Sequence, residues 1–258
     1  MSPLVSVVTV TLNCRDDIED TIKSVINQSY KKIEYLIIDG KSNDGTLNII
    51  NKYIKHIDYF VSEKDNGIYD AFNKSIKNSK GDWIIFMNSG DKFVEDDVIE
   101  KVFSKKNDCD FIYGNTIVKY FLTGKKKQIS SKPISTMWQG MPFCHQSCFI
   151  KKKINLIENY NNSNVYTGDY EFILSSFFKK FHFKYLNITV SEVVTNGLTE
   201  SNRIRTNVSN FFTYMKFEKN FLKILWHLKN ILVVLLKEII KFFIPKKLLE
   251  EISVIVNK

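Results

Sequence analysis

The sequence predicts an α/β fold in which a mostly parallel central sheet is flanked by helices. Strand-like and helix-like patterns alternate through residues 1–118, the order that builds a parallel sheet covered on both faces. The run Trp83–Met87 is continuously apolar, as in a strand buried on both sides. Of the 258 residues, 44% are hydrophobic and 25% are charged, which is ordinary for a folded protein and excludes a disordered chain.

The elements of the first half follow from their residue patterns. Leu4–Leu12 is rich in Val and Thr and predicts a buried strand. Acidic residues then precede a helix in which Ile18, Ile22 and Val25 lie on one apolar face. The same reasoning predicts further strands at 33–39, 59–62, 83–87 and 111–118, and helices at 47–54, 68–78 and 95–103.

The pattern is looser after residue 119. We expect a hairpin tip at Lys125–Lys127, an irregular segment at 130–148, a helix at 168–180, a strand at 183–190 and helices from residue 202 onward. We therefore divide the chain into a domain of residues 1–200, with halves 1–118 and 119–200, and a C-terminal helical extension, 201–258.

The net charge of +9 comes from the second half of the chain. Residues 1–118 hold 15 basic and 19 acidic side chains, whereas residues 119–258 hold 22 basic and 9 acidic ones. A basic half favours phosphates or anionic lipid headgroups as partners, the alternative being an ordinary solvated surface. No nucleic-acid-binding module is recognisable, so we expect no nucleic-acid partner. Four cysteines are too few for a disulfide framework and indicate a cytosolic compartment.

Polar residues follow the predicted strands at the positions where open parallel sheets bind ligands. Asn13, Asp39 and the turn Asn88–Asp91 occupy these positions. The turn after the first strand contains no glycine, which disfavours a dinucleotide-binding turn or a P-loop. The Asp91 carboxylate is suited to a hard cation that bridges a diphosphate. The alternative is a simple turn at the end of the strand, because Ser, Gly and Asp are common turn residues. Asp70 and Asn73 share one helix face and could line the same crevice.

Five motifs follow one another along the first half of the chain. They are Val7–Asn13, Ser24–Tyr30, Glu34–Gly40 with Ser42–Thr46, Gly67–Asn73 and Asn88–Asp91. Together they resemble the bacterial family 2 glycosyltransferases with a GT-A fold, and the resemblance extends over residues 4–200. It implies an inverting hexosyltransferase that moves a sugar from a nucleotide diphosphate donor, with a UDP-sugar favoured, to an acceptor hydroxyl. The sugar nucleotide would serve polysaccharide biosynthesis such as O-antigen or capsule assembly.

The resemblance also implies roles for individual residues. Asp91 would hold Mn²⁺ or Mg²⁺, and Asn88 stands where the family's Asp-x-Asp motif has its first Asp, which weakens the metal site by one charge. Asp169, within Thr167–Glu171, would be the catalytic base, the alternative being a carboxylate that stabilises a helix N-terminus. His145 would lie near the donor diphosphate or the acceptor, or else be structural. The donor would contact Thr11, Asn13, Asp39, Asp70, Asn73, Asn88 and Ser89.

The segment 221–247 combines a wide apolar face with lysines. A polar stripe of helical spacing runs through Lys223, His227, Asn230, Lys237 and Lys241. This pattern suits a helix that lies in a membrane interface, the alternative being packing on the catalytic domain or a dimer partner. We expect no membrane-spanning helix, because charges interrupt the apolar run.

These expectations give one leading hypothesis and one alternative. The first is a metal-dependent enzyme, peripheral on the inner face of the plasma membrane, that acts on a lipid-linked or oligosaccharide acceptor. The second is a catalytically silent sugar-nucleotide-binding or scaffold protein of a polysaccharide assembly complex. The intact acidic set Asp39, Asp91 and Asp169 favours the enzyme. The oligomeric state stays open.

Overall fold

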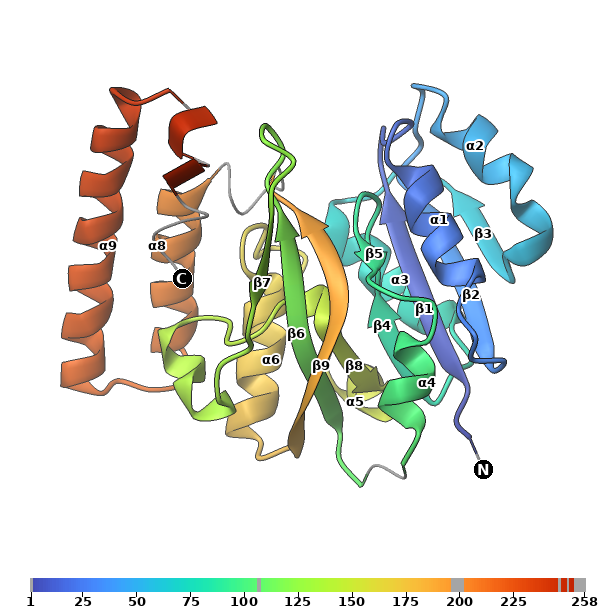
Figure 1. The fold of residues 1–258 in the computed structure, drawn as a ribbon. Coiled ribbons are helices and arrows are strands. Elements are labelled where there is room, and N and C mark those ends of the chain that lie inside the picture. The colour runs from blue at the N-terminus through green and yellow to red at the C-terminus, as the bar shows by residue number, and fades with distance from the viewer. Residues whose placement is uncertain (1, 106–107, 196–201, 246, 250, 253–258) are drawn as a thin grey trace.

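The computed structural model describes residues 2–105, 108–195, 202–245, 247–249 and 251–252. Within these residues one nine-stranded sheet forms the centre of the molecule, in the order β3-β2-β1-β4-β8-β6-β9-β5 with β7 beside β6 (Figure 1). The strands are β1 (Val5–Thr11), β2 (Ile33–Asp39), β3 (Tyr59–Ser62), β4 (Trp83–Phe86), β5 (Lys92–Phe93), β6 (Phe111–Lys119), β7 (Lys126–Ile129), β8 (Cys148–Lys151) and β9 (Phe183–Val194).

The first four strands form the parallel part of the sheet, as expected. Val5 and Val7 of β1 face one hydrophobic core, and Val8 and Val10 face the other. Helices α1 (Ile18–Ile26), α2 (Thr46–Lys52) and α4 (Val98–Phe103) cover the first core. Helices α3 (Ile68–Asn78), α5 (Lys152–Ile157) and α6 (Gly168–Phe178) cover the second. The period-2 alternation of buried side chains therefore places a helical layer on each face.

The second half of the sheet mixes strand directions. β8 runs antiparallel between β4 and β6, and β6 pairs in parallel with the long strand β9. The hairpin of β6 and β7 turns at residues 121–124, where the Gly124 N–H donates to the Tyr120 carbonyl. Lys126 and Lys127 therefore belong to β7 rather than to the tip, which corrects the expected position of the hairpin turn.

The C-terminal extension contains the helices α8 (Arg203–Met215) and α9 (Phe221–Phe242). α8 packs against α6, and α9 packs against α8 at the far end of the molecule (Figure 1). Tyr214 of α8 is fully buried in the second core, so the extension is part of the same packed unit. The boundary expected at residues 200/201 lies outside the described residues. None of the described helices has the length and apolarity that a membrane crossing requires.

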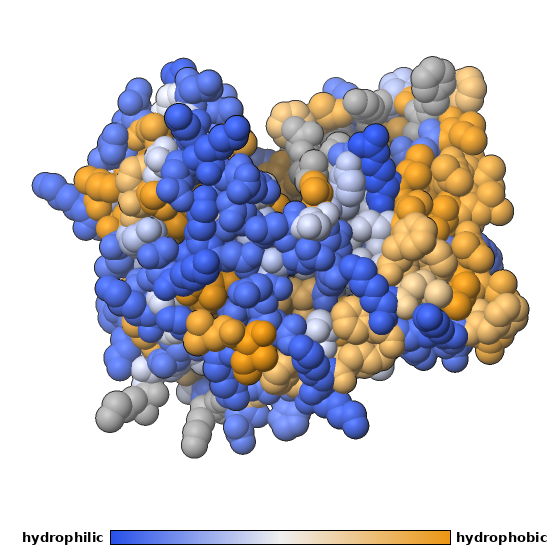
Figure 2. All heavy atoms as spheres, turned by 180° about the vertical axis from the view of Figure 1, so that it is seen from behind, coloured by the Kyte–Doolittle hydropathy of each residue, from blue (hydrophilic) through white to orange (hydrophobic). Residues whose placement is uncertain are grey.

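His227 and Asn230 of the polar stripe of α9 face the protein, whereas Lys237 of the same stripe is exposed and the leucines face outward. His227 is 3% exposed and packs on Trp138 and Tyr214, while the Asn230 side chain donates to Asn207 of α8 at 2.9 Å. Figure 2 shows the resulting apolar surface over α8 and α9, on the right of the view. We call it the outer apolar face, and it comprises Phe212, Leu222, Leu225, Leu228, Leu232, Leu235, Leu236, Ile239, Ile240 and Phe243.

Candidate active site

The carboxyl ends of β1, β2 and β4 meet at one edge of the sheet. The Met87 and Ser89 N–H groups donate to the carbonyls of Val8 and Val10, which fixes the turn after β4 beside the end of β1. Thr11 pairs with Asp39 in the β1–β2 register. The predicted strand-end residues are therefore neighbours, because parallel strands end at the same edge.

Asp39 and Asn13 form one hydrogen-bonded network at this edge. The Asp39 carboxylate is fully buried and accepts from the Ser42 N–H and hydroxyl and from the Ser62 hydroxyl. Asn13 has a left-handed backbone (φ 52°), and its N–H donates to the Ser42 hydroxyl at 2.8 Å. Its side-chain oxygen accepts from Asn43 N–H at 2.9 Å. The network shapes the loop after β2. Neither side chain lines the cavity of about 830 Å³ that lies where the two halves of the domain meet.

Asp70 and Asn73 point in different directions from α3. The Asn66 N–H donates to Asp70 at 3.0 Å, and this bond, with Lys74 at 3.3 Å, holds the pKa of Asp70 below its usual value. The Asn73 amide donates to the Tyr160 carbonyl at 2.8 Å and accepts from the Tyr160 N–H at 3.0 Å. Asn73 thus holds the segment before α6, and neither residue lines the main cavity.

A cavity of about 830 Å³ lies where the two halves of the domain meet. It is lined by residues predicted for the site: Asn88, Ser89 and Asp91 from the first half, and His145 and Asp169 from the second. The α8 residues Arg203, Thr206, Asn207 and Asn210 form a further wall. They recur at i, i+3, i+4 and i+7, so one polar face of α8 points into the cavity.

Asp91 is a buried carboxylate in this cavity, only 9% exposed. Burial raises the pKa of Asp91 to about 7, although the Gln146 side-chain N–H donates to Oδ2 at 2.9 Å and partly offsets this. Close by, Thr11 Oγ1, Asn88 Oδ1 and Ser89 Oγ are buried without a hydrogen-bond partner among the residues that the structure describes. Buried polar atoms without partners are costly, so a polar ligand or a water molecule at this edge of the cavity would lower the free energy of the folded protein.

Asp169 lies in the first turn of α6 and lines the same cavity. Its Oδ1 accepts from the Tyr69 hydroxyl at 3.1 Å and from the Tyr170 N–H at 2.8 Å. Glu171 points elsewhere, as expected, since it pairs with Asn161, Asn164 and Lys216. Asp169 is therefore the acid of this motif that faces the cavity.

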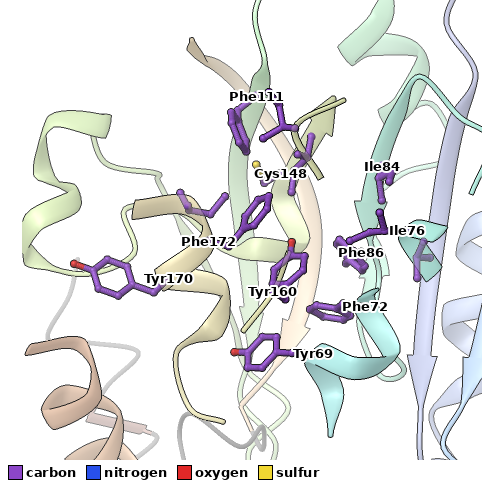
Figure 3. Close-up of a cluster of buried hydrophobic side chains, with 14 of the residues drawn as sticks. Tyr69, Phe72, Ile76, Ile84, Phe86, Phe111, Cys148, Tyr160, Tyr170 and Phe172 are labelled. Carbon is purple, nitrogen blue, oxygen red and sulfur yellow. The ribbon is translucent and has the colours of Figure 1, made fainter. Parts of the chain in front are cut away.

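His145 is buried among aromatic rings at the wall of the cavity. Its ring packs against both Phe72 and Phe86, with centroids 5.4 and 5.2 Å away, and its Nε2 hydrogen bonds with the Tyr160 hydroxyl at 2.8 Å. Burial lowers the pKa of His145, which favours the neutral ring. Figure 3 shows Phe72, Phe86 and Tyr160 in this cluster.

Sequence reasoning missed Tyr69, Gln146 and the polar face of α8. Gln146 stands beside the predicted His145, but only the fold shows that its amide reaches Asp91. The α8 residues have a readable helical period, yet nothing in the sequence tells which surface that helix faces. The alternative of a zinc site at Cys144, His145 and Cys148 finds no support, because no cluster of three metal-binding side chains occurs among the described residues.

The family model described as glycosyl transferase family 2 matches residues 6–181. Among curated proteins, the putative teichuronic acid biosynthesis glycosyltransferase TuaG of Bacillus subtilis is 37% identical over 117 residues, which are 43% of this chain and 46% of the relative. The UDP-Glc:alpha-D-GlcNAc-diphosphoundecaprenol beta-1,3-glucosyltransferase WfaP of Escherichia coli is 32% identical over 151 residues, 56% of this chain and 58% of the relative. The chain thus spans about half the length of these relatives.

Solved structures share the fold at low sequence identity. S. aureus TarS 1–349 in complex with UDP superimposes with a TM-score of 0.66 at 13% identity, over 89% of this chain and 70% of that one. The mannosyltransferase PcManGT from Pyrobaculum calidifontis, in complex with GDP-Man and Mn²⁺, gives 0.66 at 14% identity, over 90% of this chain and 70% of that one. The chain belongs to glycosyl transferase family 2 and has a fold of the GT-A type.

Proposed function

We propose that the protein is an inverting glycosyltransferase that moves a sugar from a UDP-sugar to a hydroxyl of a lipid-linked or polysaccharide-repeat acceptor. One observation carries the proposal: Asp91, with the unpaired Asn88 and Ser89 oxygens, shares one cavity with Asp169 from the other half of the domain. A donor diphosphate and an acceptor hydroxyl need these two kinds of group side by side. The WfaP name, with its UDP-glucose donor and lipid diphosphate acceptor, supports these substrate classes.

The reaction is a single displacement. Asp169 takes the proton of the acceptor hydroxyl, and the acceptor oxygen forms a bond to C1 of the sugar. The bond between C1 and the diphosphate oxygen breaks, and UDP leaves with that electron pair. Because attack and departure occur on opposite faces of C1, the configuration inverts. His145, neutral and held by Tyr160, forms the cavity wall near these groups.

The residues fit a divalent cation that is shared with the donor. Asp91 is a buried carboxylate with a raised pKa, and Asn88 Oδ1 has no hydrogen-bond partner within the described part of the chain, so both suit an oxygen-seeking cation. Mn²⁺ or Mg²⁺ at these two residues would neutralise charge on the leaving diphosphate. Arg203 is the one Lys or Arg among the described residues that line the cavity, which leaves much of that charge for a metal.

The remaining predicted donor contacts are proposed to bind the nucleoside of the donor. We propose that the nucleoside of the donor contacts Thr11, Asn13 and Asp39 at the carboxyl ends of β1 and β2, and Asp70 in the first turn of α3. Asn73 supports this region indirectly through Tyr160.

We further propose that the outer apolar face of α8 and α9 rests on an anionic membrane, on its cytoplasmic side. Between residues 216 and 249 of the described chain, the exposed charged side chains are all lysines: Lys216, Lys219, Lys229, Lys237 and Lys247. An apolar helix face accompanied by lysines matches acyl chains bordered by anionic headgroups. Such an arrangement would bring a lipid-linked acceptor to the wall that α8 forms.

The donor site is tested by thermal unfolding with UDP, with and without Mn²⁺, in the natural protein and in Asp91→Ala. A ligand at 100 times its Kd adds about 2.7 kcal/mol to the free energy of unfolding. We expect Mn²⁺-dependent stabilisation that Asp91→Ala abolishes. Asp20→Ala, which removes a carboxylate that is 76% exposed, is the matched control and should behave like the natural protein. No stabilisation by UDP or another nucleoside diphosphate would reject the proposal, whereas UDP binding without sugar transfer would indicate the silent scaffold.

A further inference from the structure

The two oxygens of the Asp169 carboxylate have different surroundings. Oδ1 accepts two hydrogen bonds, from the Tyr69 hydroxyl at 3.1 Å and from the Tyr170 N–H at 2.8 Å. Oδ2 has no hydrogen-bond partner among the residues that the structure describes. Because Asp169 lines the cavity, Oδ2 is the oxygen that remains available to a ligand there.

Gly168 leaves the space that Tyr69 fills. A Cβ added at Gly168 would lie 2.7, 2.8 and 2.9 Å from three carbons of the Tyr69 ring, closer than real Cβ contacts come. The glycine is therefore required by the close approach of the ring to the start of α6. That approach is what brings the Tyr69 hydroxyl to the Asp169 carboxylate.

The Tyr69 ring is held firmly in this position. It is 7% exposed, stacks on Tyr160 with centroids 5.9 Å apart and planes 7° apart, and meets Phe72 edge-on at 5.8 Å. Figure 3 shows Tyr69 and Phe72 on α3 beside Tyr160. One turn further along α3, Asn73 clamps the backbone of Tyr160. The same face of α3 thus holds both the Asp169 side chain and the segment that leads to it.

The Tyr69 hydroxyl donates its proton to the hydrogen bond with the Asp169 carboxylate. Burial, together with the adjacent Asp169 charge, raises the pKa of Tyr69 far above its usual value, so the hydroxyl keeps its proton at physiological pH. A donor fixed on Oδ1 restricts rotation of the carboxylate about χ2, which is otherwise broad for Asp. The direction of Oδ2 is therefore set from α3, a helix of the other half of the domain.

We propose that Tyr69 is the positioning residue of Asp169: its hydroxyl holds Oδ1 so that Oδ2 faces the acceptor hydroxyl, and Gly168 provides the space for its ring. The inference rests on the proposed role of Asp169 as the base. It assigns to α3 a function in the transfer step in addition to its place beside the donor. A small rotation that misdirects the base lowers kcat and leaves the substrate affinity unchanged, because its orientation affects the barrier of the transfer step and not substrate binding.

Tyr69→Phe keeps the ring and removes the hydroxyl. Transfer is followed as UDP release from UDP-glucose or UDP-GlcNAc with a lipid-linked GlcNAc diphosphate acceptor. We expect kcat to fall about 10- to 100-fold, the range that one lost hydrogen bond to a charged group gives. The donor KM and the Mn²⁺-dependent stabilisation by UDP should stay as in the natural protein. Tyr53→Phe removes a hydroxyl that donates to the Glu19 carboxylate away from the cavity, and this control should keep full kcat.

Gly168→Ala tests the other half of the proposal. The added methyl group should displace the Tyr69 ring and lower kcat by a similar factor. If Gly168 acts only through the Tyr69 hydroxyl, the kcat of the double variant Tyr69→Phe with Gly168→Ala should be no lower than the kcat of the more impaired single variant. Additive losses would show that Gly168 has a separate role and would overturn this part.

The outcomes separate this inference from the proposed function. If Asp169→Asn abolishes transfer while Tyr69→Phe stays within about twofold of the natural kcat, the positioning role is wrong and the base stands. If Tyr69→Phe instead raises the donor KM, Tyr69 acts on the donor site and the inference is also wrong. If Asp169→Asn retains transfer, the base assignment itself fails, and the role of Tyr69 fails with it.

Discussion

At the residue scale, the burial of the Asp91 carboxylate makes the free energy of unfolding depend on pH. An unfolded aspartate loses its proton near pH 3.8, whereas burial raises the pKa of Asp91 to about 7 in the folded protein. Between these values the folded state binds more protons than the unfolded state. The Asp91 contribution to the free energy of unfolding is therefore full below pH 3.8 and is lost as the pH rises through 7.

Asp91→Asn should stabilise the protein without ligand at pH 8, by at most about 4 kcal/mol for a shift of about three pKa units. The gain should shrink toward pH 5, because the natural carboxyl is then protonated in the folded state. Urea unfolding followed by tryptophan fluorescence at both pH values measures it. Asn at this position should also lose the Mn²⁺-dependent stabilisation by UDP. A variant that is less stable than the natural protein at pH 8 would contradict the burial argument.

The residues of the site show what a sequence can and cannot reveal. Asp91 and Asp169 stand at a strand end and a helix start within recognisable motifs, and both line the cavity, while their chemical roles stay predictions. The contact of Asn73 with the Tyr160 backbone could not be read from its helix position, since a side chain three residues from Asp70 turns to a different neighbour. Tyr69 carried no polar signal in the sequence, because a tyrosine on an apolar helix face is usually core.

At the element scale, α9 is a helix that the sequence predicts without predicting which of its faces contacts the protein. Its helical period could be read directly, but the direction of its polar stripe depends on tertiary packing. His227 and Asn230 face α8, while the leucines face outward. The result is an amphipathic helix whose polar side contacts protein. Such a helix exposes apolar surface that a monomeric soluble domain rarely leaves uncovered.

His227 makes the packing of α9 sensitive to pH. Its Nε2 is buried and has no hydrogen-bond partner among the described residues, and burial lowers the pKa of His227 below its usual 6.5. The unfolded state then binds more protons below pH 6.5, so the stability that the neutral ring contributes is present above that pH and lost as the pH falls. The side chains around the ring are Trp138, Phe211, Tyr214 and Trp226, and Lys223 stands over Trp138.

His227→Phe should therefore raise the Tm at pH 5.5 more than at pH 7.5. Phenylalanine keeps the aromatic packing and has no nitrogen to protonate or to leave unpaired. The expected gain at the lower pH is about 1 to 3 kcal/mol, the cost of one unsatisfied buried polar group. His56→Phe, at an exposed position, is the matched control. An equal shift at both pH values would show that His227 acts through packing alone.

At the scale of the whole molecule, the sequence predicted the first half better than the second. Residues 4–103 follow a local rule, strand then helix, in which each element covers the one before it. The second half depends on pairings between distant segments: β8 enters between β4 and β6, and β9 joins β6 some 70 residues away. Such non-local pairing leaves little trace in local periodicity. The polar wall of α8 follows from the same long-range packing.

The outer apolar face gives the last prediction, that the protein binds anionic vesicles. We expect co-sedimentation with vesicles that contain phosphatidylglycerol, and weaker binding to pure phosphatidylcholine or at high salt, because the lysines contribute by charge. Replacing Leu228, Leu232 and Ile239 by Glu should reduce partitioning about tenfold or more, since each loses its apolar burial and adds a repelled charge. These side chains are 49%, 57% and 59% exposed, so the folded structure should tolerate the change. Leu156→Glu with Ile157→Glu, on the exposed surface of α5, is the matched control. A dimer in sedimentation velocity that the triple variant converts to a monomer, without vesicle binding by the natural protein, would show instead that a second copy covers this face.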